Sequence, residues 1–342
     1  MNLYEKAAEF LNSIEPKHGV IIVYNNDMDG MASCTMMKKY LEKKGNKPYI
    51  IFQPMPPEKN FLRRVQTSLP DFIIFVDMAM DSEPNIIKKL KGIAQILVID
   101  HHVIVRDLNS HGILHLNPRF ENPKTYQSAS YLVYSLLSTM KEEPDEWIAM
   151  LGVVGDYVLD DSKDVVKKAL KIAPIETYRF VCGSVEAARV SKRFSCDQIV
   201  DIIISSNSID DLAQKRDFIE AAAIVEGEIQ KEMSNASENM EIHGNIILYH
   251  CASKYSIRSN IATMISEKNP GKIVIAYGSH GKNVVGSVRT KGKMNTVNIL
   301  KKAFAGAKNA SYGGHEAASG FSVPEMKWKD FKDNLIKAAE GY

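Results

Sequence analysis

Short apolar runs rich in β-branched residues alternate with helical segments through the first half of the chain. Each run has five or six residues, and at least 17 residues separate one run from the next. Runs of this length and composition are typical of strands that are buried on both faces of a parallel sheet, with helices as the connections. The predicted strands are residues 20–24, 48–52, 72–76 and 94–99, and the predicted helices are residues 31–44, closed by Gly45, and 83–91.

The second half of the chain predicts a helical stretch followed by a smaller α/β unit. Helical periodicity extends from Ser128 to about Gln230, and its last part favours a linker helix over a flexible tether. Strands are predicted at 244–250, 272–277 and 283–289, with helices at 259–268 and 296–305. We therefore predict an α/β protein of two domains, with a larger parallel-sheet domain over 1–200, a helical linker over 201–243 and a smaller domain over 244–342.

Composition restricts the class of protein. The chain of 342 residues is 45% hydrophobic and 25% charged, as is usual for a globular protein with two cores. Apolar runs fall well short of the roughly 20 residues that a membrane helix needs, and the first residues lack the layout of a signal peptide. Four scattered cysteines without a Cys-x-x-Cys pair argue against a zinc ribbon. We expect a cytoplasmic protein without a membrane partner.

Charge is divided unequally along the chain. Residues 245–342 hold 15 Lys and Arg against 6 Asp and Glu, a net charge of +9, whereas residues 1–244 hold 28 against 35, a net charge of −7. This division predicts that the basic part binds a polyanion and that the acidic part binds cations. The alternative interpretation is two unrelated solvated surfaces.

Acidic and imidazole side chains stand where the predicted strands end. Asp27 and Asp29 follow the first strand, Asp77 follows the third, and Asp100-His101-His102 follows the fourth. Because the carboxyl ends of parallel strands meet at one edge of the sheet, these side chains are expected in one cleft. Asp156, after an apolar helical stretch, is placed to complete the group.

Such a cluster of carboxylates needs cations to offset its mutual repulsion. Mixed Asp and His ligands suit Mn²⁺, with Mg²⁺ as a less suitable substitute. Two ions about 3.5–4 Å apart can bind a phosphate oxygen and generate a hydroxide nucleophile, which is the requirement of phosphoester hydrolysis. The structural alternative is that an Asp after a strand caps the next helix.

Five motifs in register resemble those of the DHH phosphoesterase superfamily. They are Asn26-Asp27-Met28-Asp29-Gly30, Asp77, Asp100-His101-His102, Gly155-Asp156 and, for the C-terminal DHH-associated domain, Gly313 to Phe321. Within the superfamily, the chain resembles the archaeal RecJ-like nucleases that associate with the replication factor GINS. The resemblance implies a two-manganese DHH domain at 1–200 and a DHH-associated, substrate-binding domain at 244–342.

The resemblance also implies a role for each motif residue. It assigns Asp27 and Asp77 to one metal ion, Asp29, Asp77, His101 and Asp156 to the other, His102 to the scissile phosphate, and Asp100 to the orientation of the two histidines. The family usually has His or Asp at the position of Asn25, as a ligand of the first ion. Since Asn is a neutral and weaker ligand, this departure predicts weak occupancy of that site or a demand for high Mn²⁺.

The basic domain carries the residues that the resemblance assigns to the substrate. These are Ser287 and Arg289 in a predicted strand, and Gly313, Gly314 and His315 in the C-terminal motif. Arg engages a phosphate with two hydrogen bonds, and a Gly pair lets backbone N–H groups approach one. Three tyrosines in this domain, Tyr255, Tyr277 and Tyr312, are expected to pack rather than to stack on bases.

We predict a metal-dependent exonuclease that is specific for single-stranded DNA or RNA and linked to replication or repair. Two alternatives remain. One is a largely non-catalytic scaffold that binds GINS, for which Asn25 is the sequence support. The other is a phosphodiesterase of small molecules or very short RNAs, which the same chemistry would serve.

Overall fold

The computed structural model describes residues 2–55, 57–58, 60–292, 294–305 and 310–339, and the side chains of Ser237 and His315 lie outside this description. The chain forms two compact units, Met1–Ala222 and Ala223–Tyr342. The predicted fold class, α/β with two domains, is confirmed. The domain boundaries expected near residues 200 and 243 stay predictions.

A parallel five-stranded sheet forms the centre of the first unit, in the order β2-β1-β3-β4-β5. The strands are β1 (Val20–Tyr24), β2 (Tyr49–Phe52), β3 (Phe72–Val76), β4 (Gln95–Ile99) and β5 (Leu114–Leu116). Strand β1 lies between β2 and β3, so the strand order reverses there. In open parallel sheets such a switch point opens a crevice beyond the carboxyl ends of the strands.

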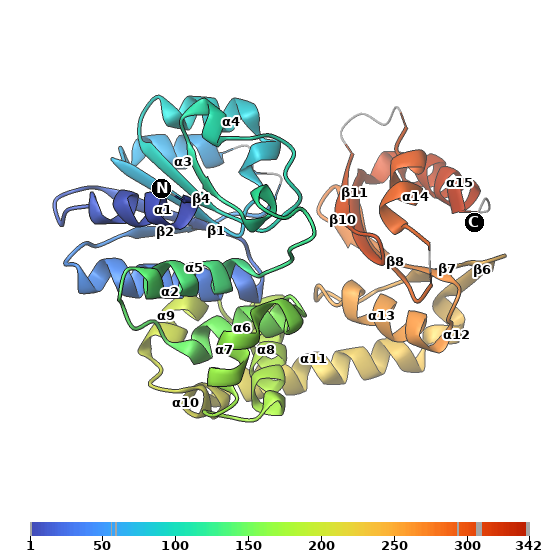
Figure 1. Cartoon of the computed structure of the whole chain (residues 1–342). Helices are drawn as coiled ribbons and strands as arrows, with labels where there is room; N and C mark the ends of the chain where they lie inside the picture. Colours follow the sequence, from blue (N-terminus) through green and yellow to red (C-terminus); the bar gives the residue numbers. More distant parts are fainter. Residues whose placement is uncertain (1, 56, 59, 293, 306–309, 340–342) are drawn as a thin grey trace. The chain divides into compact units, whose positions relative to one another are not determined.

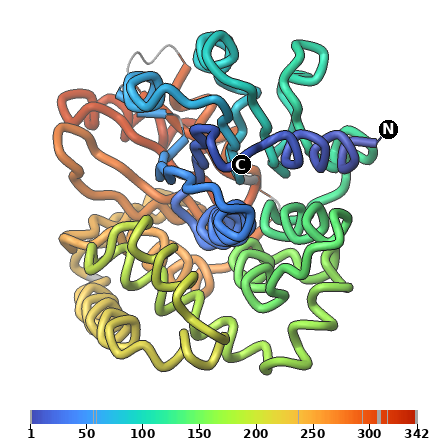
Figure 2. The backbone as a smooth tube through the Cα atoms, turned by 90° about the vertical axis from the view of Figure 1, so that its left-hand side faces the viewer, coloured from blue at the N-terminus to red at the C-terminus, as the bar shows by residue number. Residues whose placement is uncertain are grey.

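Helices cover both faces of this sheet (Figure 1). They are α1 (Leu3–Asn12), α2 (Met28–Lys43), α3 (Phe61–Thr67), α4 (Pro84–Lys91) and α5 (Ala129–Thr139). On one face, Phe61 of α3 and Leu90 of α4 pack on strand residues such as Phe75. Helices α1, α2 and α5 cover the other face, and Figure 2 shows the teal α4 and the blue α2 on opposite sides of the strands.

A group of helices follows α5 and packs against α2. It comprises α6 (Glu146–Gly155), α7 (Lys163–Ala169), α8 (Ile175–Val190), α9 (Cys196–Ser205) and α10 (Ile209–Ala213). The polar helix expected near the end of this stretch is present as α11 (Arg216–Ser234), followed by α12 (Ala236–Asn239). The boundary between the two units falls inside α11.

The second unit is built on a six-stranded mixed sheet in the order β10-β11-β9-β8-β7-β6, in which only the β7–β8 pair is parallel among the described strands. The strands are β6 (Met240–His243), β7 (Ile246–His250), β8 (Ile273–His280), β9 (Asn283–Thr290), β10 (Ser311–His315) and β11 (Ala318–Pro324). Helices α14 (Thr296–Ala303) and α15 (Trp328–Ala339) pack on the core face, and α13 (Arg258–Lys268) packs on β8 and β9.

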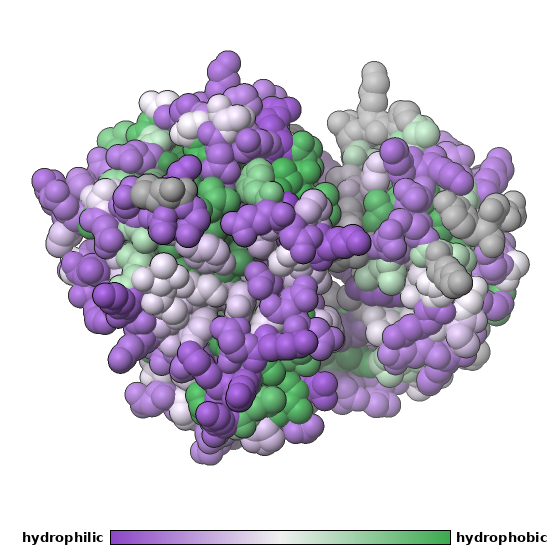
Figure 3. Space-filling model, viewed as in Figure 1, coloured by the Kyte–Doolittle hydropathy of each residue, from purple (hydrophilic) through white to green (hydrophobic). Residues whose placement is uncertain are grey.

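In the described parts of the chain, no helix is both long and apolar enough to cross a membrane. Hydrophilic residues predominate on the face that Figure 3 shows.

Candidate metal centre

The first motif lies at the junction of β1 and α2. Helix α2 begins at Met28, three residues earlier than the predicted Met31, because the side chain of Asp27 caps it and accepts a hydrogen bond from the Gly30 N–H at 2.9 Å. Asp29 therefore belongs to the first turn of α2. Glycine is required at position 30, where a Cβ would lie 2.4 Å from the Asn25 carbonyl oxygen.

Asp29 is fully buried and held by the start of α5. Its two carboxylate oxygens accept hydrogen bonds from the backbone N–H groups of Ala129 at 2.6 Å and Ser130 at 2.9 Å. Gly152 of α6 makes room for this contact, because a Cβ there would lie 2.3 Å from Asp29 Oδ1. Burial raises the pKa of Asp29 to about 6, although the hydrogen bonds oppose the rise.

His101 joins two further carboxylates. Its Nε2 lies 3.1 Å from Asp77 Oδ1 and 3.3 Å from Asp156 Oδ2. Asp77 follows β3 in the left-handed backbone region (φ +57°), and Asp156 caps the C-terminus of α6. Burial, reinforced by the neighbouring carboxylates, raises the pKa of Asp77 well above its usual value and that of Asp156 to about 9.

His102 pairs with Asp100 rather than with the other carboxylates. Its Nδ1 lies 2.7 Å from Asp100 Oδ1, and the Asp100 side chain is buried while that of His102 is 35% exposed. Burial opposes the charged imidazole, but the Asp100 carboxylate overcomes this effect and raises the pKa of His102 to about 9. Burial likewise opposes ionisation of Asp100, yet the nearby imidazoles hold its pKa below the usual range.

The donor atoms fit a divalent ion. In the described residues, two sets of possible ligands have their donor atoms within 4.8 Å of one another: Asp29 with His101 and Asp156, and Asp77 with His101 and His102. Mixed carboxylate and imidazole donors suit Mn²⁺. Since His101 belongs to both sets, the two sets are contiguous.

Asn25 occupies the space between the two carboxylates that the resemblance assigns to the first ion. Its Nδ2 donates to Asp27 Oδ2 at 2.7 Å and to Asp77 Oδ2 at 3.2 Å. The amide thus supplies N–H groups where a cation would supply positive charge. With this amide orientation, Asn25 is a hydrogen-bond donor to the cluster rather than a ligand.

Three residues that sequence reasoning missed support the two histidines. Arg119 Nε donates to the His101 carbonyl oxygen at 2.8 Å, and Asn117 Nδ2 donates to the His102 carbonyl oxygen at 3.0 Å. The Tyr126 ring lies 5.4 Å from the His101 ring and 5.6 Å from the Arg119 guanidinium. The Asn-Pro turn signal directly after β5 was the only available sign of this support.

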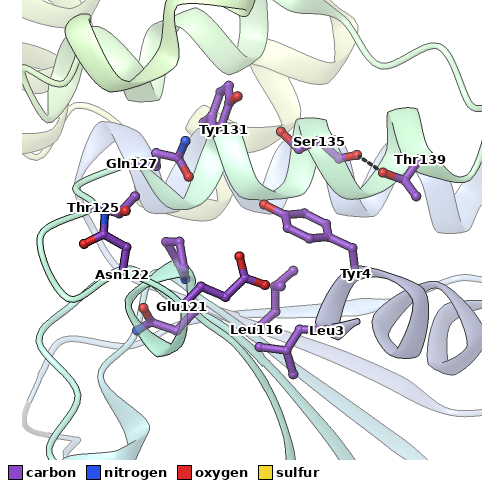
Figure 4. A pocket seen from close by; sticks show the side chains of 12 residues that line it. Leu3, Tyr4, Leu116, Glu121, Asn122, Thr125, Gln127, Tyr131, Ser135 and Thr139 are labelled. Carbon is purple, nitrogen blue, oxygen red and sulfur yellow. Dashed lines mark hydrogen bonds between the residues drawn. The ribbon is translucent and has the colours of Figure 1, made fainter. Parts of the chain in front are cut away.

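Asn117 also lines a cavity of about 420 Å³. Figure 4 shows Tyr4 of α1 and Glu121 turned toward this space from opposite walls, with Gln127 above them. None of the predicted metal or phosphate residues is among the described residues that line it. The cavity is therefore separate from the acidic cluster.

In the second unit, the sheet register brings the predicted substrate residues into rows. Ser287 is opposite Gly320, which is opposite Gly313 of β10, and Arg289 is opposite Ala318. Ser287 and Arg289 alternate with the core residues of β9 and so share the face on which α13 packs. The side chain of His315 lies outside the described residues.

Arg289 is fixed by its own neighbours. Its guanidinium donates to the carbonyl oxygens of Val288 at 2.9 Å and Ser319 at 3.3 Å, and to Ser259 Oγ of α13 at 2.5 Å. Gly314 of β10 has a backbone conformation (φ +129°) in which a Cβ would lie 2.5 Å from the Ala318 carbonyl oxygen. Gly313 and Gly314 are thus part of the edge strand β10.

Two of the tyrosines in this unit pack as expected. The ring of Tyr277 lies 4.5 Å from that of Trp328, and the ring of Tyr312 lies 5.0 Å from that of Phe304. Tyr277 belongs to the core of the second unit, whereas Tyr312 is 40% exposed and covers the core residue Phe304 from the surface.

The α/β fold and the buried group of carboxylates and imidazoles form a candidate metal centre, and family models identify the family to which the chain belongs. Residues 19–155 match the N-terminal domain of the DHH family, and residues 249–342 match the DHHA1 domain. The chain belongs to the DHH phosphoesterase superfamily, as its motifs predicted. The predicted enzyme class, a phosphodiesterase or exonuclease, is the class of enzyme that this superfamily contains. No curated protein sequence matches the chain significantly.

Solved structures with similar folds have low sequence identity. RecJ from Thermus thermophilus, solved with Mn²⁺, has a TM-score of 0.80 at 16% identity and covers 100% of this chain and 55% of its own, and its structure with Mg²⁺ has a TM-score of 0.72. The chain thus spans about half the length of that RecJ. A pGpG-specific phosphodiesterase from Vibrio cholerae has a TM-score of 0.52 at 17% identity, covering 94% and 99% of the two chains. CDC45 from Entamoeba histolytica has a TM-score of 0.57 at 10% identity, covering 98% of each.

Proposed function

We propose that this protein is a metal-dependent exonuclease that hydrolyses single-stranded DNA or RNA. The observation that carries the proposal is the buried group of carboxylates around His101 at the carboxyl edge of the sheet. Structural carboxylates are rarely buried together, because each raises the pKa of the others unless cations bind. Membership of the superfamily and the RecJ-like fold support the same reaction.

The residues that would hold the ions are those of the four N-terminal motifs. Asp27 and Asp77 would hold one Mn²⁺, and Asp29, Asp77, His101 and Asp156 the other, with Mg²⁺ as a substitute. When bound, the ions would supply positive charge for the phosphate oxygens and lower the pKa of a nucleophilic water. Asn25 contributes no charge, so the first site is the weaker one.

The remaining residues would position the phosphate and the strand. Asp100 engages His102 Nδ1 and keeps the imidazole protonated near neutral pH, which leaves Nε2 to donate a hydrogen bond to a phosphate oxygen. Ser287, Arg289, Gly313, Gly314 and His315 of the basic domain would contact the sugar-phosphate backbone. Contacts of this kind give little base specificity.

Digestion of end-labelled single strands of DNA and RNA with Mn²⁺ tests the proposal. The protein should release mononucleotides, and Asp77→Ala should abolish the release. Asp71→Ala is the matched control, because Asp71 stands at the opposite end of β3, where its side chain accepts a hydrogen bond from the Gly19 N–H. The absence of products from either end of either strand with Mn²⁺ would refute the proposal.

A scaffold role is the second candidate, and the fold similarity to CDC45 together with Asn25 favours it. In this role the protein would bind GINS in DNA replication or repair, with little catalysis. Retention of purified GINS subunits on the immobilised protein tests this role independently of cleavage.

A third candidate follows from the fold similarity to the pGpG phosphodiesterase. Such an enzyme would act on dinucleotides, in the same cleft and with the same residues. Cleavage of two-mers much faster than of twenty-mers would favour it over the exonuclease.

A further inference from the structure

Tyr157 occupies an unfavourable position at the end of α6. Its φ of +59° is left-handed, its N–H donates to the Val154 carbonyl, and the next N–H, of Val158, donates to the Val153 carbonyl. This is the position after a helix at which glycine is preferred, because a side chain there strains the backbone. The Tyr157 side chain gains no packing in return, since the residue is 92% exposed.

Two of the most exposed apolar residues of the first unit are sequence neighbours of the acidic cluster. Among its described residues, the large apolar side chains that are more than 60% exposed are Leu69, Val103, Val105 and Tyr157. Tyr157 directly follows Asp156, and Val103 directly follows His102. Two of the four therefore directly follow cluster residues, and these two belong to different segments of the chain. An exposed aromatic ring next to a phosphate site is available to a base of the bound strand.

We propose that Tyr157 is a base-stacking residue that holds the nucleobase next to the scissile phosphate. The inference rests on the proposed function, in which the phosphate occupies the acidic cluster and its nucleoside lies beside it. Every base has a π face that a tyrosine ring can cover, so the contact is independent of sequence. Val103 and Val105 supply a second apolar contact on the segment after His102.

Stacking at this position requires an unpaired base. In a duplex, neighbouring base pairs cover both faces of each base, whereas a single strand can turn a base toward Tyr157. The residue therefore contributes to the preference for single strands. The basic domain supplies backbone contacts, and Tyr157 supplies the base contact in the catalytic unit.

Kinetics with matched variants test the proposal. Tyr157→Asn removes the ring and keeps the left-handed backbone, which Asn tolerates better than other side chains. Leu69→Asn is the control, because Leu69 is also left-handed (φ +44°) and 83% exposed but lies outside the site residues. With Mn²⁺ and a single-stranded oligonucleotide, Tyr157→Asn should raise KM about tenfold with little change in kcat, and Leu69→Asn should change neither.

A strand with abasic nucleotides at the reacting end separates stacking from a structural effect. Wild type and Tyr157→Asn should have equal KM on it, and Tyr157→Phe should behave as wild type on the normal strand. An unchanged KM for Tyr157→Asn, or an equal rise on the abasic strand, would overturn the inference. The second result would mean that these apolar residues contact a part of the strand other than a base.

A binding measurement keeps this inference separate from the proposed function. Single strands should quench the emission of the Tyr157→Trp variant beyond that of the wild type, which already holds Trp147 and Trp328. Quenching without cleavage by the wild type would refute the exonuclease and keep the stacking site. Cleavage without the additional quenching would refute only the stacking site.

Discussion

At the scale of single residues, Asn25 links two carboxylates of the cluster. It donates to both Asp27 and Asp77, and so stabilises two neighbouring carboxylates without adding charge. We expect Asn25→His to place a neutral imidazole ligand there and to tighten Mn²⁺ binding by about 10- to 100-fold, comparable with the effect of other metal-site substitutions.

Titration calorimetry with Mn²⁺ measures this change. Asn26→His is the control, because it adds the same side chain one residue away from the amide that bridges the carboxylates. Equal Mn²⁺ affinity of wild type and Asn25→His would show that the position is not a ligand position in this protein.

The raised pKa values of the cluster predict how metal removal affects stability. Burial raises the pKa of Asp29 to about 6 and of Asp156 to about 9, so the folded metal-free protein holds protons that the unfolded chain has released. A group with a raised folded pKa stabilises the fold at low pH, and this stabilisation is lost as pH rises through the folded pKa. Asp29 loses this stabilisation by about pH 6 and Asp156 only by about pH 9, so the melting temperature in EDTA should continue to fall between about pH 6 and 9 because of Asp156.

Mn²⁺ should restore more stability at pH 9 than at pH 6, because it binds the ionised carboxylates. Melting curves with EDTA and with Mn²⁺ at the two pH values provide the measurement. Curves that shift by the same amount at both pH values would contradict the assignment of Asp156 to the metal site.

The strand-end carboxylates could be predicted from the sequence because they follow recognisable apolar runs. Asp77 and His101 follow strands whose residues are all apolar or nearly so, and the parallel topology brings them to one edge. The roles of Arg119 and Asn117 could not be predicted, because these residues donate hydrogen bonds to the backbone carbonyl oxygens of the two histidines. Such contacts leave no periodic pattern in the sequence.

At the scale of elements, the approach of α6 to α2 and α5 depends on Gly152. A Cβ at this position would lie 2.2 Å from Ser130 Oγ and 2.3 Å from Asp29 Oδ1. Gly152→Ala should therefore destabilise the fold by about 1–3 kcal/mol through overpacking and should also reduce activity, because it displaces Asp29.

Urea denaturation measures the stability change. The matched control is Gly183→Ala in α8, where a Cβ meets nothing within 4 Å and the residue is exposed. That substitution should stabilise the protein by about 0.4–1 kcal/mol, as expected when a helical glycine becomes alanine. Destabilisation of both variants by the same amount would refute the packing role of Gly152.

Elements were predictable where local pattern and tertiary structure agree. Strands β1 and β3 begin and end at the predicted residues, since each is a continuous apolar run. Helix α2 begins three residues early because a single cap at Asp27 determines its start. Strands β10 and β11 were missed, because Gly-rich segments carry little strand signal. Their extended conformation depends on the pairing of β10 with β11 and of β11 with β9.

At the scale of the whole molecule, charge and chemistry are divided between the two parts of the chain. The acidic part holds the cluster that needs cations, and residues 245–342, with a net charge of +9, hold the residues proposed to contact the backbone of the strand. Binding through phosphates releases counterions, so affinity should fall as the salt concentration rises. The slope of the logarithm of the affinity against the logarithm of the salt concentration measures the number of cationic contacts with phosphates.

Arg289→Ala should reduce that slope by about one phosphate contact and weaken binding to all sequences alike. Lys332→Ala is the control, because it removes the same charge from the same unit at a position where the lysine pairs with Glu241 at 2.6 Å. Anisotropy of a labelled single strand, measured in the Asp77→Ala background to prevent cleavage, gives the slope between about 50 and 200 mM salt. Equal slopes for the two variants would mean that the basic unit binds by net charge alone, because a specific phosphate contact is lost only with Arg289.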